Sequence, residues 1–309
     1  MTKGYLFFGD ALGMATLMHS DWKRADAALN SIGRVATTSL KATLPGGLGR
    51  PGAAPGARLV VFNDSVFFFA HDPAAVVHFA STLALSLMLT TEEKGGPIAL
   101  RGGIAQSASP PAVRERTEGA PCPVTAVRFV ADRVSAALVA EKGRVLGPRI
   151  LIEREIIDEG LPHWPFRLAA KLMAINTIPK NLQVDTLRVD GDASSYVDLG
   201  WMVVEDAQTL ARLSEAIDVL NRSSAFSSRA AIHTAATRAL WKLANARRNG
   251  LSRLLQRKHF AGQQKSGVRP KTLECDYREW LNLVPQIEAA LGMKIVFPIE
   301  MSGFTEFPK

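Results

Sequence analysis

Two runs of strand-forming residues, Leu59–Phe62 and Val66–Phe69, are separated by only three residues, Asn63-Asp64-Ser65. Branched and aromatic side chains favour extended backbone, whereas Asn and Asp favour tight turns. The segment therefore predicts a β-hairpin whose turn lies at or beside Asp64. The elements on either side of this hairpin then decide the fold.

Strands and helices alternate around the hairpin in a regular order. The predicted elements are a buried strand at 5–9, a helix over 14–44, the hairpin, a helix over 74–93 that begins after Pro73, and a strand at 98–105. The Gly- and Pro-rich segment 45–56 predicts an irregular loop. The order β-α-β-β-α-β over residues 4–105 is the ferredoxin-like arrangement, so we expect an α+β fold.

The rest of the chain carries weaker strand signals and then long helical ones. Strands are predicted at 149–152 and 197–204, and helices at 206–222, 226–260 and 276–291, with a break near Gly250. We therefore divide the chain into a catalytic domain, 1–205, and a helical C-terminal region, 206–309, that packs on or extends the core.

The composition limits the compartment and the kind of partner. The two cysteines are too few for a disulfide framework or a cysteine zinc site, and no apolar run reaches the length of a membrane span. We therefore expect a cytoplasmic protein. The net charge of +8 favours an acidic partner, which leaves nucleotide, nucleic acid and anionic membrane surfaces open. Much of this surplus lies between Arg238 and Lys271.

The predicted topology brings two carboxylates together. In this fold the first strand lies antiparallel beside the third, so the end of the first strand and the hairpin turn share one sheet edge. Asp10 and Asp64 should therefore lie close to one another, as oxygen ligands for Mg²⁺ or Mn²⁺. Asp10 could instead cap a helix and Asp64 could serve only the turn.

The residues around these carboxylates resemble motifs of the class III nucleotide cyclases, and most closely the bacterial pyrimidine cyclases of Pycsar anti-phage defence. The resemblance covers about residues 4–250. It is carried, in order, by Phe8–Met14, Phe62–Val66, Ala99–Ile104, Ala140-Glu141 with Gly147–Ile150, and Leu187–Asp192 with Tyr196–Asp198. Each motif is short, but five in the family's order make a chance match improbable.

The resemblance implies a set of site residues and a reaction. Asp10 and Asp64, with the carbonyl of Ala11, would hold two divalent ions, Mn²⁺ or Mg²⁺, and Arg101 would contact the nucleotide phosphates or base. The ribose 3′-hydroxyl of a nucleoside triphosphate would attack the α-phosphate, giving a 3′,5′-cyclic monophosphate and pyrophosphate. The family's sites form across a head-to-tail homodimer, so the resemblance also implies a dimer.

One position departs from the pyrimidine cyclases. These enzymes carry a tyrosine shortly before the second metal-binding aspartate to read the base, whereas this segment reads Gly56–Phe62 without one. Arg58 is the large polar residue there, and its donors suit the acceptor oxygens of uracil or cytosine. The resemblance favours UTP, with CTP or a purine nucleotide still open.

A second hypothesis is a catalytically silent, cyclase-like module that binds nucleotide or nucleic acid through basic helices. Residues 238–258 combine basic and apolar side chains, although such a pattern is more often a solvated helix face. The pair of aspartates favours the enzyme and argues against nucleic acid, because carboxylates do not assist polyanion binding. A polymerase palm shares the fold, but the chain shows no insertions the size of fingers or thumb.

Overall fold

A computed structural model describes the chain over residues 3–44, 56–107, 112–118, 124–130, 147–160, 172–174, 196–202, 204, 206–223, 233, 237 and 241. The chain separates into two compact units, Met1–Gly143 and Arg144–Lys309, and each is described by itself. No helix among the described residues is long and apolar enough to span a membrane.

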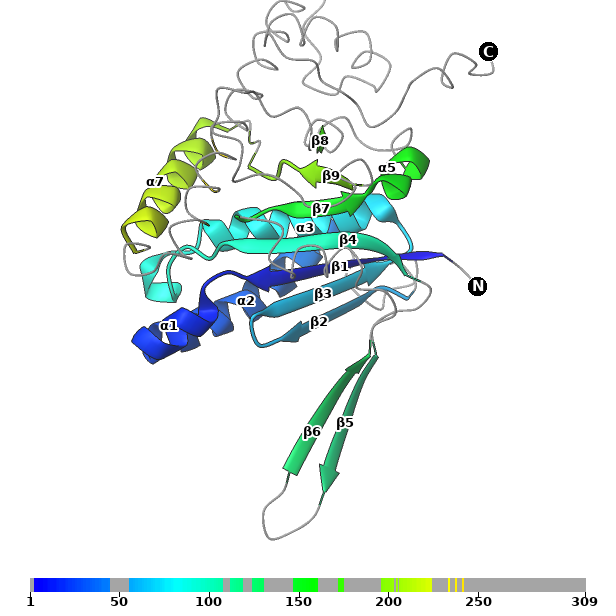
Figure 1. Ribbon diagram of the computed structural model, residues 1–309, viewed down its shortest axis with the longest axis horizontal. Coiled ribbons are helices and arrows are strands. Elements are labelled where there is room, and N and C mark those ends of the chain that lie inside the picture. Colours follow the sequence, from blue (N-terminus) through cyan, green and yellow to red (C-terminus); the bar gives the residue numbers. More distant parts are fainter. Residues whose placement is uncertain are drawn as a thin grey trace, which may run out of the picture. The chain divides into compact units, whose positions relative to one another are not determined.

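The first unit contains the predicted ferredoxin-like core (Figure 1). Its elements are β1 (Gly4–Ala11), α1 (Met14–Ser20), α2 (Trp22–Thr43), β2 (Arg58–Phe62), β3 (Ser65–Ala70), α3 (Pro73–Met88), the short 3₁₀ helix η1 (Glu92–Lys94) and β4 (Leu100–Ser107). The strands lie in the order β2-β3-β1-β4, and neighbouring strands are antiparallel. This order confirms the fold predicted from residues 4–105.

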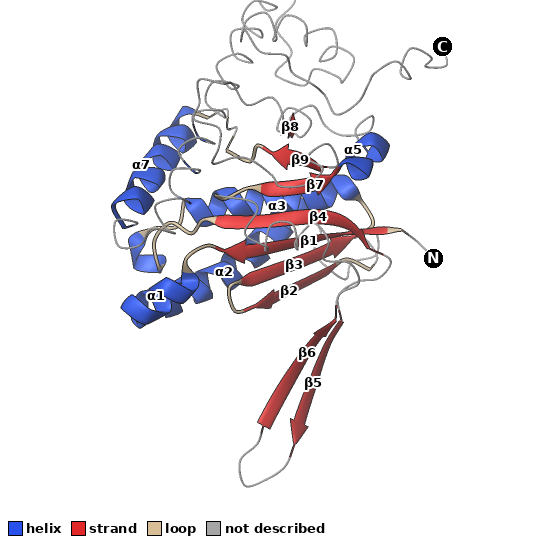
Figure 2. Cartoon of the chain, in the orientation of Figure 1, coloured by secondary structure: helices blue, strands red, loops and turns tan. Residues whose placement is uncertain are grey.

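Both faces of the central strands are apolar. Phe7 of β1 and Phe68 of β3 pack on Phe79 of α3, with ring centroids 6.0 and 4.4 Å from that of Phe79. Figure 2 shows α2 and α3 on this face of the sheet. Because side chains alternate along a strand, the opposite face carries a second buried cluster, which consists of Leu6, Phe8, Phe67 and Phe69 with Val60. Burial on both faces explains the unbroken apolar run in β3.

The helix predicted over 14–44 is two helices, so that prediction was wrong about its continuity. Asp21 interrupts it with a non-helical backbone, φ −153° and ψ 84°. The Asp21 carboxylate accepts a hydrogen bond from the Arg24 N–H at 3.0 Å and so caps α2, while its own N–H bonds the Leu17 carbonyl. The stronger local preference of Asp for a cap outweighs the continuing apolar periodicity.

Other predicted boundaries also differ. Helix α3 ends at Met88 rather than near residue 93, and β4 begins at Leu100 and runs to Ser107. A hairpin of β5 (Ala112–Glu118) and β6 (Val124–Val130) follows β4 and was not predicted. Its sequence interleaves charged residues with valines, so it offers no apolar run of the kind that revealed β2 and β3.

The second unit contains three strands that pair with one another. It contains β7 (Ile150–Glu153), α5 (Arg154–Gly160), β8 (Leu172–Ala174), β9 (Tyr196–Leu199) and α7 (Ala207–Ser223). Strand β9 lies between β7 and β8 and is antiparallel to both. The strand at 149–152 and the helix at 206–222 are thereby confirmed, whereas the strand predicted over 197–204 ends at Leu199. The loop 45–55 and, apart from isolated positions, the helices predicted over 226–260 and 276–291 lie outside the described residues.

Candidate metal centre

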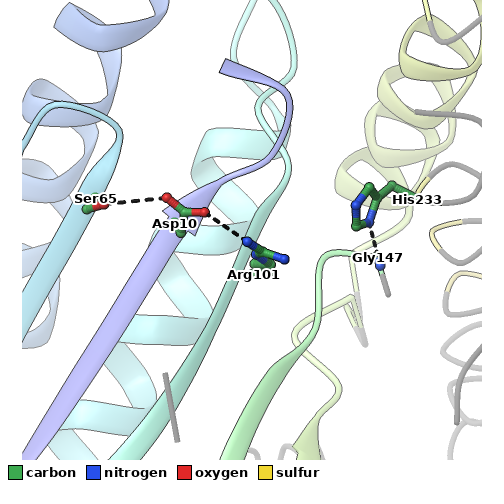
Figure 3. Close-up of polar contacts among 5 residues, drawn as sticks. All are labelled: Asp10, Ser65, Arg101, Gly147 and His233. Atoms are coloured by element: carbon green, nitrogen blue, oxygen red, sulfur yellow. Dashed lines mark hydrogen bonds and ion pairs between the residues drawn. The ribbon is translucent and has the colours of Figure 1, made fainter. Parts of the chain in front are cut away.

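Asp10 lies near the end of β1, between two polar residues of the neighbouring strands. Its register partners are Ser65 on β3 and Arg101 on β4, so the three side chains share one face of the sheet. The Ser65 hydroxyl lies 3.4 Å from Asp10 Oδ1, and Arg101 Nη2 lies 3.4 Å from Asp10 Oδ2 (Figure 3). Phe8 is on the same face, which is the one opposite α3.

Asp10 does not cap a helix, which was the alternative role considered for it. Asp10 belongs to β1, and the residue that caps α1 is Gly13, which has a left-handed backbone with φ 84°. No atom of the described residues lies within 4 Å of the position where a Cβ of Gly13 would stand. The Asp10 side chain therefore plays no part in capping α1.

Asp64 is joined to the end of β1 through the backbone. Asn63 and Asp64 form the turn between β2 and β3, and Asn63 takes up the left-handed conformation with φ 51°. The Asp64 carbonyl accepts a hydrogen bond of 3.0 Å from the N–H of Ala11. This bond fixes the turn against the residue that follows Asp10, as the topology predicted.

The Asp64 side chain contrasts with that of Asp10. It is half-buried, and its carboxylate makes no hydrogen bond or ion pair within the described part of the chain. The turn is held by the Asp64 carbonyl, so its stability does not explain the carboxylate. None of the described residues occupies the two carboxylate oxygens of Asp64, which can therefore accept a ligand.

The donor set at this edge suits a hard cation. Two carboxylates and the backbone of Ala11 supply oxygen donors only, which is what Mg²⁺ and Mn²⁺ prefer. No group of three potential side-chain ligands of the His, Cys, Asp and Glu types occurs among the described residues. An ion held here by Asp10 and Asp64 would therefore complete its shell with main-chain, water or substrate oxygens.

Arg101 places a buried positive charge at the same point. The residue is 8% exposed, and its Nε is buried without a hydrogen-bond partner. Next to it, a Cβ at Gly102 would collide with the carbonyl oxygen of Phe8, so the Arg-Gly-Gly sequence reflects close approach of β4 to β1. Ser65 is the site residue that sequence reasoning missed, although its place opposite Asp10 follows from the hairpin and the strand pairing.

Arg58 is not part of this group. It is the first residue of β2, it is exposed, and its register partner is Phe69, whereas Asp64 follows the other end of β2. The structure therefore brings together Asp10, Ala11, Asp64 and Arg101, and it leaves Arg58 separate within the chain.

In the second unit, a hydrogen-bonded turn precedes β7. The indole N–H of Trp201 donates to the Pro148 carbonyl at 2.7 Å. The Gly147 N–H donates to Nδ1 of His233 at 3.1 Å, as Figure 3 shows. Gly147 has φ 77°, a conformation that favours glycine. These contacts explain the Gly147–Ile150 motif as a structural element of this unit.

No protein-family model matches this chain, and no curated protein matches it. Among solved structures, the guanylate cyclase domain of RhGC from Catenaria anguillulae, in complex with GTP, is 15% identical with a TM-score of 0.35, over 51% of this chain and 81% of that chain. Two structures of adenylate cyclases from Trypanosoma brucei in their monomeric state are each 10% identical with a TM-score of 0.42, over 65% of this chain and 88% or 90% of theirs. At this degree of similarity, the function has to be inferred from the chain's own site.

Proposed function

We propose that this chain is a metal-dependent nucleotide cyclase that converts UTP, or CTP, to the 3′,5′-cyclic monophosphate and pyrophosphate. The observation that carries the proposal is the convergence of Asp10 and Asp64 at one sheet edge, tied by the Ala11–Asp64 hydrogen bond and next to buried Arg101. A metal centre of two carboxylates with an adjacent cation suits a triphosphate. The sequence motifs around the same residues resemble those of the class III nucleotide cyclases, which is why we propose cyclisation as the reaction.

The residues divide the chemistry between them. Asp10, Asp64 and the Ala11 carbonyl would hold two divalent ions, Mn²⁺ or Mg²⁺, which lower the pKa of the attacking hydroxyl and neutralise phosphate charge. The 3′-oxygen would form a bond to the α-phosphorus as its proton passes to solvent water. The bond between that phosphorus and the oxygen that bridges to the β-phosphate would break, and pyrophosphate would leave. Arg101 would attract the phosphates, and its buried position strengthens that attraction.

The base would be read by a second copy of the chain. Arg58 is remote from the metal centre of its own chain along β2, so in a head-to-tail homodimer it would contribute to the partner's site. Its guanidinium donors suit the carbonyl oxygens of a pyrimidine, and UTP is the favoured substrate. The catalytic region would comprise residues 1–205, and the product would serve as a second messenger in bacterial anti-phage defence in the cytoplasm.

The direct test incubates the full chain with ATP, GTP, CTP and UTP separately, each with Mn²⁺, and identifies products by chromatography and mass spectrometry. We expect cyclic UMP or cyclic CMP and an equal amount of pyrophosphate. Asp64→Ala should give neither, and Arg58→Ala should alter the preference among bases. Absence of a cyclic product from every nucleotide would overturn the proposal.

The binding-module alternative makes a different prediction. It expects salt-sensitive polyanion binding that survives Asp10→Ala and Asp64→Ala but is lost when Arg247, Arg248 and Arg253 are neutralised. A filter-binding measurement on single-stranded DNA at two salt concentrations separates this outcome from catalysis.

A further inference from the structure

The two carboxylates of the metal centre have unequal surroundings. Asp10 faces a guanidinium, with Arg101 Nη2 3.4 Å from Oδ2, whereas the Asp64 carboxylate has no ion-pair partner among the described residues. A divalent ion that approaches Asp64 meets an available ligand. The same ion at Asp10 meets a carboxylate whose charge Arg101 already compensates.

Arg101 is held in this position by burial more than by good hydrogen bonding. Its side chain is 10% exposed, its Nε is buried without a partner, and the one ion pair is longer than the 2.7–2.9 Å usual for a charge-assisted bond. A buried cation with an incomplete set of acceptors gains from a second anion. It also repels any further cation that shares its carboxylate.

We propose that Arg101 couples divalent-ion binding to triphosphate binding by acting as an internal counter-ion of Asp10. Without nucleotide, Arg101 neutralises Asp10 and weakens binding of a free ion. A bound triphosphate offers phosphate oxygens to Arg101, which releases Asp10 to the ion. Ion and triphosphate therefore bind cooperatively, and neither site fills well alone. The inference rests on the proposed function, because it takes a triphosphate as the ligand of Arg101.

The first experiment measures Mn²⁺ binding to the full, nucleotide-free protein by electron paramagnetic resonance. We expect Arg101→Met to raise Mn²⁺ affinity on the order of tenfold, within the range typical of coupled sites. Arg101→Lys, which keeps the charge, should stay close to the wild type. Arg34→Met removes an equal charge from an exposed position on α2 and should change nothing. Equal affinity in the wild type and Arg101→Met would overturn the proposal.

The reciprocal experiment measures UTP binding in the presence of EDTA by equilibrium dialysis. Asp10→Asn should strengthen UTP binding because it frees Arg101, and it should have no such effect in the Arg101→Met background. Asp64→Asn removes the same charge without an ion pair, so its effect should be equal in both backgrounds. Additive effects of Asp10→Asn and Arg101→Met would contradict the coupling. If Arg101→Met does not fold, Arg101→Gln, which also removes the charge, serves as the second background for this measurement.

These outcomes distinguish the coupling from the enzymatic proposal. If the wild type forms cyclic product but Arg101→Met binds Mn²⁺ with unchanged affinity, the coupling is wrong and the cyclase proposal stands. Raised Mn²⁺ affinity in that variant, without product from any nucleotide, would keep the coupling of ion and triphosphate and remove the catalysis.

Discussion

Asp10 and Asp64 perform related roles at the proposed centre, but their removal should affect the protein differently. Asp10 is the counter-ion of a buried arginine, while the Asp64 carboxylate makes no hydrogen bond or ion pair with the described residues. The difference follows from strand pairing, since Asp10 lies in a strand opposite Arg101 and Asp64 lies in a turn.

We therefore expect Asp10→Ala and Asp64→Ala both to abolish cyclisation but only the first to destabilise the fold. Leaving Arg101 buried without its acceptor should lower the free energy of unfolding by about 1–3 kcal/mol. Asp64→Ala should change it by no more than about 0.5 kcal/mol. Urea unfolding measures both, and in Asp10→Ala/Arg101→Met the loss should be smaller than the sum of the single losses. Equal stability of Asp10→Ala and Asp64→Ala would show that the Asp10–Arg101 ion pair contributes nothing to stability.

Gly102 should tolerate no larger residue. A Cβ there would collide with the Phe8 carbonyl oxygen across the β1–β4 pair, so Gly102→Ala should destabilise the unit by about 1–3 kcal/mol. Gly33 is the matched control, because it lies in α2 with nothing within 4 Å of its Cβ position. Gly33→Ala should stabilise by about 0.5–1 kcal/mol. Thermal unfolding of the two variants should shift the midpoint in opposite directions, and a shift in the same direction would contradict the packing at Gly102.

At the scale of elements, the turn of the β2–β3 hairpin brings Asp64 to the proposed metal centre. The left-handed Asn63 allows a tight turn that presents the Asp64 carbonyl to Ala11. Asn63→Gly should preserve turnover, whereas Asn63→Val should lower stability by roughly 1–2 kcal/mol, because a branched residue is strained at positive φ. Turnover of Asn63→Val should also fall by more than the loss of folded protein explains. It is measured with saturating nucleotide and expressed per folded molecule. Unchanged turnover in that variant would show that the turn does not position Asp64.

The elements also show what a sequence can reveal. The run of four apolar residues in β3 and the turn residues before it were enough to predict the hairpin, and the order of elements then predicted that Asp10 and Asp64 meet. The break at Asp21 was missed because a single capping interaction interrupts a pattern that otherwise continues. The ion pair of Arg101 could not be predicted, because it depends on the strand register, which places Arg101 rather than a neighbour opposite Asp10.

At the scale of the whole molecule, the proposed homodimer predicts how much activity returns when two site variants are mixed. If the metal ligands of each site come from one copy and Arg58 from the other, a mixed dimer of Asp64→Ala and Arg58→Ala has one intact site and one doubly altered site. With free exchange, half of the dimers are mixed, so an equal mixture should recover about a quarter of wild-type UTP turnover. Turnover equal to the average of the two separate variants would contradict composite sites. Sedimentation at the assay concentration checks that dimers are present.

Asp10, Ser65 and Arg101 occupy one level across three adjacent strands, and the same register buries Phe7, Phe8, Phe67 and Phe68. A slip of one residue would move each side chain of the slipped strand to the opposite face, which would separate ring pairs such as Phe8–Phe67 and Phe7–Phe79 and misplace the carboxylate. Assembly of the centre therefore needs no adjustment after folding. The helices around the centre could change more freely in evolution, because the information that aligns the three residues is the same information that makes the sheet fold at all.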